Sequence, residues 1–192
     1  CPPSCGLEIN FRRIKDNPNI EILTLAEVEK VDGTPGDYAV SVKISPRYVN
    51  ENCTVCGDCE AACQTDISSD FNFGLSTTKG AYMPFEMAFP ARYVLSPEII
   101  GTDDAQSCKA ACKYDAIDLE MAPETIELNV GAVVWATGWE PYDATKIDNL
   151  GFGQHENIVT NMMIERLASA NGPTKGQILR PSDDKAPESI AF

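Results

Sequence analysis

Short stretches in which apolar and polar residues alternate fill the first quarter of the chain. Residues 7–15 have the spacing of a short helix, which Asn17-Pro18 would end. Alternation at every second position is typical of half-buried strands. Such strands are expected at 19–25, 27–31 and 38–44. Because a turn at 33–36 would join the last two strands, this region is expected to be a small antiparallel β-meander.

The second half of the chain has a different pattern. Val130 to Ala136 is a continuous apolar run, which is typical of a strand buried on both faces of a parallel sheet. Shorter strands are expected at 116–119, 125–129 and 157–160. Thr160 is placed to cap a helix that extends to about residue 170. Residues 67–94 are broken by Gly and Pro and predict mostly irregular structure. The fold class is therefore α+β or α/β.

Charge and composition narrow the classes of function. The 192 residues include 29 acidic and 15 basic ones, with a net charge of -14. This balance argues against binding to nucleic acid, which favours a basic surface. No apolar run approaches the roughly 20 residues that span a bilayer, and no signal peptide is present. We expect a cytoplasmic protein, and an internal piece of a longer chain, because the sequence starts at Cys1 and ends in what reads as a new strand.

Four of the eight cysteines form one dense run, Cys53-Thr-Val-Cys56-Gly-Asp-Cys59-Glu-Ala-Ala-Cys63. The C-x2-C-x2-C-x3-C spacing is typical of a bacterial [4Fe–4S] ferredoxin, in which a tight loop wraps several corners of a cubane cluster. Gly57 leaves room for the backbone to approach that cluster. A structural zinc site and reduced core cysteines are the alternatives, although zinc sites more often use two separated C-x2-C pairs.

A second cysteine set follows at Cys108 and Cys112. In two-cluster ferredoxins each run lends its last cysteine to the other cluster. If Cys112 is that last cysteine, two earlier ligand positions fall on Thr102 and Ala105, which carry no thiol. We therefore predict one [4Fe–4S] cluster, with Cys63 and Cys108 spare or weakly ligating. Its ligands would be Cys53, Cys56, Cys59 and Cys112. The rival assignment replaces Cys112 by Cys63.

The turn Ala136-Thr137-Gly138 follows the long apolar run. Small residues at the carboxyl end of a buried strand let the backbone approach a cofactor, although an ordinary turn has the same sequence. The stretch Gly151-Phe-Gly153-Gln-His-Glu156 lacks the third glycine of a pyrophosphate-binding motif, and we interpret it as a loop. Cys1 and Cys5 are weak candidates for a redox pair, and His155 is a weak candidate for a general base.

Several motifs in order resemble one family. They are Asn19-Ile…Leu23-Thr…Glu27-Val-Glu, Pro46-Arg-Tyr-Val, the cysteine run, Pro84…Ala88-Phe-Pro…Tyr93, Ala116-Ile-Asp, Val130-Gly-Ala-Val-Val-Trp-Ala-Thr-Gly, Asn157-Ile-Val-Thr, Gly172-Pro-Thr and Arg180-Pro-Ser-Asp. Together they resemble the flavoprotein A subunit of heterodisulfide reductase. Three segments are most similar to the branch of this family found in the quinone-interacting membrane-bound oxidoreductase of sulfate reducers. They are Cys5-Gly-Leu-Glu-Ile-Asn-Phe, Glu86-Met-Ala-Phe-Pro and Ala132-Val-Val-Trp-Ala-Thr-Gly-Trp.

This resemblance implies a thioredoxin-reductase-like FAD-binding core with an inserted ferredoxin-like domain. The implied domains are 1–46 and 123–192 for parts of the core, and 47–122 for the insertion. It implies that Ala136, Thr137 and Gly138 lie close to FAD, and that electrons pass between FAD and [4Fe–4S]. Without a glycine motif ahead of Cys1, this piece is not expected to bind FAD or be active alone.

The same resemblance implies partners. They are a second flavoprotein subunit, a quinone-reactive membrane subunit, and adenylylsulfate reductase. These partners would place the protein at the inner face of the membrane and between menaquinol and sulfate reduction. One alternative is the heterodisulfide reductase A subunit itself, in which the flavin splits electron pairs. Another is an interaction module that has lost its cofactors or is stabilised by zinc. Thr102 and Ala105 are where the chain departs from the two-cluster pattern.

Overall fold

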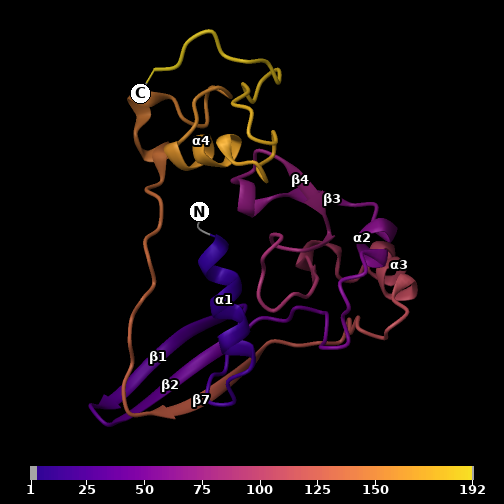
Figure 1. Cartoon of the computed structure of the whole chain (residues 1–192), viewed down its shortest axis with the longest axis vertical. Coiled ribbons are helices and arrows are strands. Elements are labelled where there is room, and N and C mark those ends of the chain that lie inside the picture. Colours follow the sequence, from indigo (N-terminus) through magenta and orange to yellow (C-terminus); the bar gives the residue numbers. More distant parts are fainter. Residues whose placement is uncertain (1–3, 192) are drawn as a thin grey trace. The chain divides into compact units, whose positions relative to one another are not determined.

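The computed structural model describes residues 4–191, which combine short helices with small sheets (Figure 1). The α-helices are α1 (Ser4–Lys15), α2 (Asp58–Ala62), α3 (Asp103–Ala111) and α4 (Asn161–Ala168). The strands are β1 (Ala26–Thr34), β2 (Asp37–Ile44), β3 (Asp66–Ser68), β4 (Thr77–Lys79), β5 (Ala81–Tyr82), β6 (Val94–Leu95) and β7 (Glu124–Val130). Short 3-10 helices cover Asp70–Asn72, Pro97–Ile99, Ala144–Lys146 and Asp148–Leu150. The expected mixture of α and β structure is confirmed.

The chain divides into two units. The first contains the chain up to Thr65 together with Lys79–Trp135, and the second contains Asp66–Thr78 and the chain from Ala136 onward. The predicted domain boundaries at 46 and 122, and the thioredoxin-reductase-like and ferredoxin-like folds, stay predictions. None of the helices in the described part of the chain is long and apolar enough to cross a membrane.

An antiparallel sheet in the order β1-β2-β7 forms one part of the first unit. Pro35 and Gly36 make the turn between β1 and β2, and Gly36 has φ +94°, as a type II turn requires at its third position. Val40 and Val42 alternate along β2 and are each only 6% exposed. The strands expected near 27–31, 38–44 and 125–129 are confirmed.

The expected β-meander is wrong in its first strand, at residues 19–25. Residues 19–25 form no strand, and β7, which comes more than 75 residues later, pairs with β2 instead. Ile20 and Ile22 are 46% and 40% exposed, and Leu25 has φ +55°, which breaks an extended conformation. The alternation of apolar residues indicated one-sided burial correctly for β2 but carried no information about which strand would pair with it.

The helix expected at 7–15 is confirmed as α1. Phe11 on this helix stacks on Phe89, with ring centroids 5.1 Å apart and planes inclined by 20°. This aromatic contact joins α1 to the irregular segment between β5 and β6, because both rings bury a face against each other.

A hydrophobic core lies around α2 and α3, which pack side by side (Figure 1). Its buried members are Val49, Cys59, Cys63, Ala81, Tyr93, Leu95, Ile99, Cys108, Ala116 and Ile117. Val49 and Ile117 form an isolated antiparallel bridge, and Asn50 N donates to Ala116 O at 2.8 Å. The strand expected at 116–119 is thus reduced to one bridge, which joins the segment before the cysteine run to the segment after α3.

The strand expected at 130–136 is wrong. Strand β7 ends at Val130, and residues 131–143 have no regular structure. Val134 and Trp135 are 86% and 63% exposed. A strand buried on both faces needs covering layers and a neighbour on each side, and within residues 4–191 β7 pairs only with β2.

The second unit contains β3 paired with β4 and the helix α4. Thr160 caps α4 by accepting a hydrogen bond from Met163 N at 3.3 Å, so the expected helix is confirmed. Arg166 on α4 donates to Asn72 Oδ1 from two nitrogens and lies 4.3 Å from the centroid of Phe71. The strand expected at 157–160 does not form.

Truncating Leu95 tests whether this core stabilises the first unit. Leu95 is 0% exposed, so Leu95→Ala is expected to lower the free energy of unfolding by about 2–5 kcal/mol. Leu7 on α1 is 40% exposed, and Leu7→Ala should change the same quantity by no more than about 0.5 kcal/mol. Chemical denaturation of both variants measures the difference, and equal losses would show that the core is not packed as described.

Candidate metal centre

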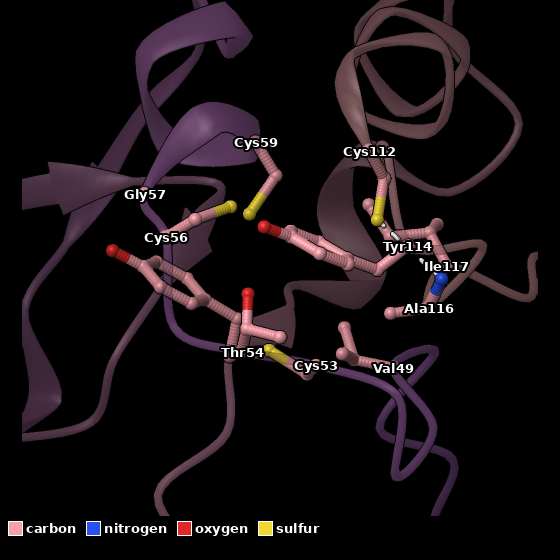
Figure 2. A pocket seen from close by; sticks show the side chains of 11 residues that line it. Val49, Cys53, Thr54, Cys56, Gly57, Cys59, Cys112, Tyr114, Ala116 and Ile117 are labelled. Atoms are coloured by element: carbon pink, nitrogen blue, oxygen red, sulfur yellow. Dashed lines mark hydrogen bonds between the residues drawn. The ribbon is translucent and has the colours of Figure 1, made fainter.

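Four cysteines from two separate segments line one pocket. Cys53, Cys56 and Cys59 come from the dense run, and Cys112 comes from the end of α3. Figure 2 shows their sulfur atoms turned toward the space between the two segments. Val49, Ala116 and Ile117 supply apolar walls. The structure therefore brings together the four residues that the crossed ligand assignment selects.

The loop between Cys53 and α2 has an unusual backbone. Val55 has φ +58° and Gly57 has φ +85°, both in the left-handed region. A β-branched residue such as Val rarely adopts this conformation, so the surrounding structure must hold Val55 there. Left-handed residues alternating with ordinary ones bend successive amide groups toward a common concave side, and such nests occur at many iron–sulfur sites.

The end of α3 carries Cys112 to the same pocket. Cys112 is the residue that ends α3, and its Sγ accepts a hydrogen bond from Ala116 N at 3.4 Å. The bridge between Val49 and Ile117 fixes the turn that follows it. Val49 lies just before Cys53, and Ile117 lies just after Cys112. Their pairing therefore brings the cysteine loop and the end of α3 beside each other.

Burial controls the charge of the innermost thiol. Cys59 is 8% exposed, and burial raises its pKa to about 11, so it is a neutral thiol at neutral pH unless a cation binds it. Metal coordination would replace that proton. Near the rim, Lys113 Nζ and Asp58 Oδ2 form an exposed ion pair at 3.0 Å, which raises the pKa of Lys113.

The two kinds of metal site make different demands on the thiols. The four ligands of zinc must meet at one atom. A cubane cluster takes one thiolate at each of four irons, so its ligands surround a larger volume. A C-x2-C-x2-C loop together with one distant cysteine on the same pocket is the pattern typical of the cluster.

Cys63 and Cys108 lie elsewhere in the core. They are 1% and 0% exposed, and neither lines the pocket of the other four. Cys108 Sγ donates to Cys59 O at 3.4 Å, and burial raises the pKa of Cys108. A methyl group on Gly80 would come within 2.5 Å of Ile99 Cγ2 and 3.3 Å of Cys63 Sγ. The space beside Cys63 is therefore already filled by aliphatic side chains.

Asp104 joins the two helices at this second position. Its carboxylate accepts hydrogen bonds from Gln64 N at 2.9 Å, Thr65 N at 2.6 Å and Cys63 Sγ at 3.6 Å. A side-chain hydrogen bond from Thr65, followed by the backbone bonds from residues 64 and 65, lowers the pKa of Asp104 to about 2. Asp104 stands between the thiol-free positions Thr102 and Ala105, and its carboxylate on α3 holds the backbone that follows α2.

The remaining candidates lie outside this pocket. Ala136, Thr137 and Gly138 are exposed residues of the irregular segment after β7, and Gly138 has φ +68°. His155 lies in a loop, and its backbone N–H donates to Gly151 O at 3.2 Å. Cys1 and the side chain of Cys5 lie outside the described residues, so their expected redox role stays a prediction.

Sequence reasoning missed two aromatic residues of the pocket. Tyr93 and Tyr114 both line it. Tyr114 is 47% exposed, whereas Tyr93 is 6% exposed. Tyr114 could have been found from its position two residues after Cys112, but Tyr93 is far in the sequence from both groups of cysteines and carries no local signal that links it to them.

Comparisons with known proteins give one consistent group of relatives. The chain is 40% identical over 181 residues to the iron-sulfur A subunit (form 1) of the CoB–CoM heterodisulfide reductase of Methanopyrus kandleri, a match that covers 94% of this chain and 27% of the relative. It is 37% identical over 189 residues to the A subunit of the H(2):CoB-CoM heterodisulfide,ferredoxin reductase of Methanothermobacter marburgensis, covering 98% and 28%. No family model matches the chain.

A third relative extends the same group. The A subunit of the ferredoxin:CoB-CoM heterodisulfide reductase of Methanosarcina acetivorans is 37% identical over 182 residues, which are 93% of this chain and 23% of the relative. The chain thus spans about a quarter of the length of these curated relatives. The family resemblance drawn from the motifs is confirmed, whereas the quinone-interacting branch stays a prediction.

Removing the charge of Asp104 tests its structural role. Asp104→Asn is expected to lower the melting temperature, because a neutral amide oxygen accepts the bonds from residues 64 and 65 more weakly. Asp103→Asn is the matched control, since Asp103 lies in the same first turn of α3 and its side chain forms no hydrogen bond or ion pair in the described chain. Thermal denaturation followed by circular dichroism compares them, and equal melting temperatures would contradict this role.

Proposed function

We propose that this chain, which belongs to the family of heterodisulfide reductase A subunits, holds one [4Fe–4S] cluster and passes electrons between it and FAD bound by the longer protein. The proposed ligands are Cys53, Cys56, Cys59 and Cys112. Cys63 and Cys108 are not ligands in this proposal. The chain would thereby serve as an electron-transfer segment of an iron–sulfur flavoprotein oxidoreductase.

One observation supports the cluster above all others. Three thiols of a C-x2-C-x2-C loop and one thiol from the end of α3, about 50 residues later, line the same apolar pocket. A packed core would not need four thiols on one cavity wall. The names of the relatives describe iron–sulfur subunits, which supports the same kind of cofactor.

The residues of the pocket have separate tasks. When bound, the cluster supplies a centre that accepts and releases single electrons at a potential set by its surroundings. The four cysteines would hold it as thiolates from two directions. Val49, Ala116 and Ile117 exclude water from one side, and the left-handed loop at Val55 and Gly57 directs backbone dipoles toward it.

The flavin contact belongs to another segment. We propose that Ala136, Thr137 and Gly138 approach FAD in the longer protein, since their backbone is exposed and two of the three have minimal side chains. No G-x-G-x-x-G motif occurs in these 192 residues. The phosphate groups of FAD would therefore be bound by other residues of the longer protein.

Two assemblies can use such a segment. The relatives are subunits of heterodisulfide reductases, which favours flavin-based splitting of electron pairs in a complex with a cysteine-rich heterodisulfide-reducing subunit. The sequences around Cys5, Glu86 and Ala132 favour the second assembly, the quinone-interacting membrane-bound oxidoreductase. In this assembly, the partners are a second flavoprotein subunit, a quinone-reactive membrane subunit, and adenylylsulfate reductase. Anaerobic co-purification of the full-length protein distinguishes these two sets of partners.

Serine substitutions test the crossed ligand set. Cys112→Ser is expected to abolish the dithionite-bleachable visible absorbance and the bound iron and acid-labile sulfide. Cys63→Ser is expected to retain all of them, because Cys63 lies outside the pocket. Anaerobic purification with iron and sulfide assays measures both variants.

Three results would contradict this proposal in different ways. Loss of iron in Cys63→Ser but not in Cys112→Ser would support the uncrossed assignment. Colourless protein with bound zinc would support a zinc-stabilised interaction module. Wild-type protein without any metal would support a module that has lost its cofactors.

A glycine substitution tests the flavin contact separately. Gly138→Val in the full-length protein is expected to lower the FAD content per chain while leaving the iron content unchanged, because a β-branched side chain would obstruct close approach and disfavour φ +68°. Gly153→Val imposes similar strain at φ +80° in a loop and should leave both contents unchanged. Equal FAD loss in the two variants would contradict a specific role for Gly138.

A further inference from the structure

Tyr93 is a buried polar side chain that the proposed ligand set does not use. It is 6% exposed and lines the pocket of Cys53, Cys56 and Cys59. A methyl group on Gly57 would come within 3.7 Å of the Tyr93 hydroxyl oxygen, so this oxygen lies against the turn of the cysteine loop. Tyr93 therefore presents a hydroxyl group, rather than only a ring, at the edge of the candidate centre.

The Tyr93 hydroxyl has one defined partner. It donates a hydrogen bond of 2.7 Å to Oε2 of Glu60, the residue that follows Cys59 on α2. Burial, followed by the Glu60 carboxylate, raises the pKa of Tyr93, which keeps the phenol protonated as the donor. The bond spans 33 residues and joins the irregular segment before β6 to the helix of the cysteine run.

The charge of Glu60 is not neutralised within the described residues. The neighbouring carboxylate of Asp58 pairs with Lys113 at 3.0 Å, whereas Glu60 forms no ion pair with a Lys, Arg or His of the described chain. An exposed glutamate on a helix normally samples many positions in water. The bond from the buried Tyr93, which itself lines the pocket, holds this carboxylate beside the tyrosine hydroxyl instead.

We propose that Tyr93 positions Glu60 so that its carboxylate lowers the reduction potential of the cluster, an inference that rests on the proposed function. Reduction adds a negative charge to the cluster, and a fixed anion nearby makes that addition less favourable. Solvent access and charge near the sulfurs are known determinants of iron–sulfur potentials. Tyr93 acts here through Glu60, so it is a positioning residue.

Two conservative substitutions separate this effect from packing. Tyr93→Phe keeps the ring in the pocket wall and removes only the hydroxyl donor. Glu60→Gln keeps the shape of the side chain and removes its charge. Both are expected to move the midpoint potential of the cluster to a more positive value. Because the two residues act as one unit, the double variant should shift no further than the larger single shift.

Matched controls come from the same protein. Tyr38 on β2 lies outside the residues that line the pocket, so Tyr38→Phe removes a tyrosine hydroxyl elsewhere and should leave the potential unchanged. Glu124 lies at the start of β7, outside the residues that line the pocket, and Glu124→Gln controls for removal of one charge. Anaerobic redox titration of the full-length protein, followed by electron paramagnetic resonance of the reduced cluster, measures every variant. The signal is assigned by its absence from Cys112→Ser.

Each outcome decides the proposal. Positive shifts in Tyr93→Phe and Glu60→Gln, with both controls at the wild-type potential, support it. An unchanged potential in either single variant overturns it while leaving the cluster in place. If Tyr93→Phe loses its iron, Glu60→Gln alone decides, and an unshifted potential there overturns the proposal. Wild-type protein without iron refutes the proposed function itself, which is a distinguishable failure.

Discussion

The pairing of residues 48–50 with residues 116–118 is the contact on which the candidate centre depends. Val49 and Ile117 form a bridge, and Asn50 N and Asp118 N donate across it at 2.8 and 3.1 Å. Cys53 follows one side of this bridge and Cys112 precedes the other. Together with the packing of α2 against α3, the bridge fixes the loop of three cysteines relative to the end of α3, so that four thiols line one pocket. The bridge also buries Val49 and Ile117, which form an apolar wall of the pocket.

The surroundings of the two groups of cysteines differ, and particular neighbouring residues cause the difference. The first position is the pocket of Cys53, Cys56, Cys59 and Cys112, and the second is the region around Cys63 and Cys108. At the first position four thiols surround a pocket, and the neighbouring side chains leave space. At the second position Ala105 is fully buried, Ile99 fills the space beside Gly80, and Asp104 binds the backbone after Cys63. A hydrogen-bonded carboxylate and aliphatic packing thus surround Cys63 and Cys108, where the first position has an open pocket. The remaining thiols Cys63 and Cys108 are small, buried core residues.

The sequence predicted short-range features well and long-range pairing poorly. The Pro35-Gly36 turn, the cap at Thr160 and the cysteine spacing all depend on neighbours within a few residues, and each was found from the sequence. The crossed set was also suggested by spacing alone, although its chemistry stays a proposal. Strand β7 was assigned correctly, but its pairing with β2 could not be read from alternation. The apolar run after it was mistaken for a buried strand, because hydrophobicity does not say whether a covering layer is present.

One measurement tests the central claim most directly: the Mössbauer spectrum and iron content of the anaerobically prepared, iron-57-enriched chain of 192 residues. The account predicts the spectrum of one [4Fe–4S] cluster per chain, which dithionite reduces by one electron. A second cluster of equal intensity would contradict the packed second position. Iron-free protein in which the described cysteines (Cys53, Cys56, Cys59, Cys63, Cys108 and Cys112) all react as free thiols would contradict the account as a whole.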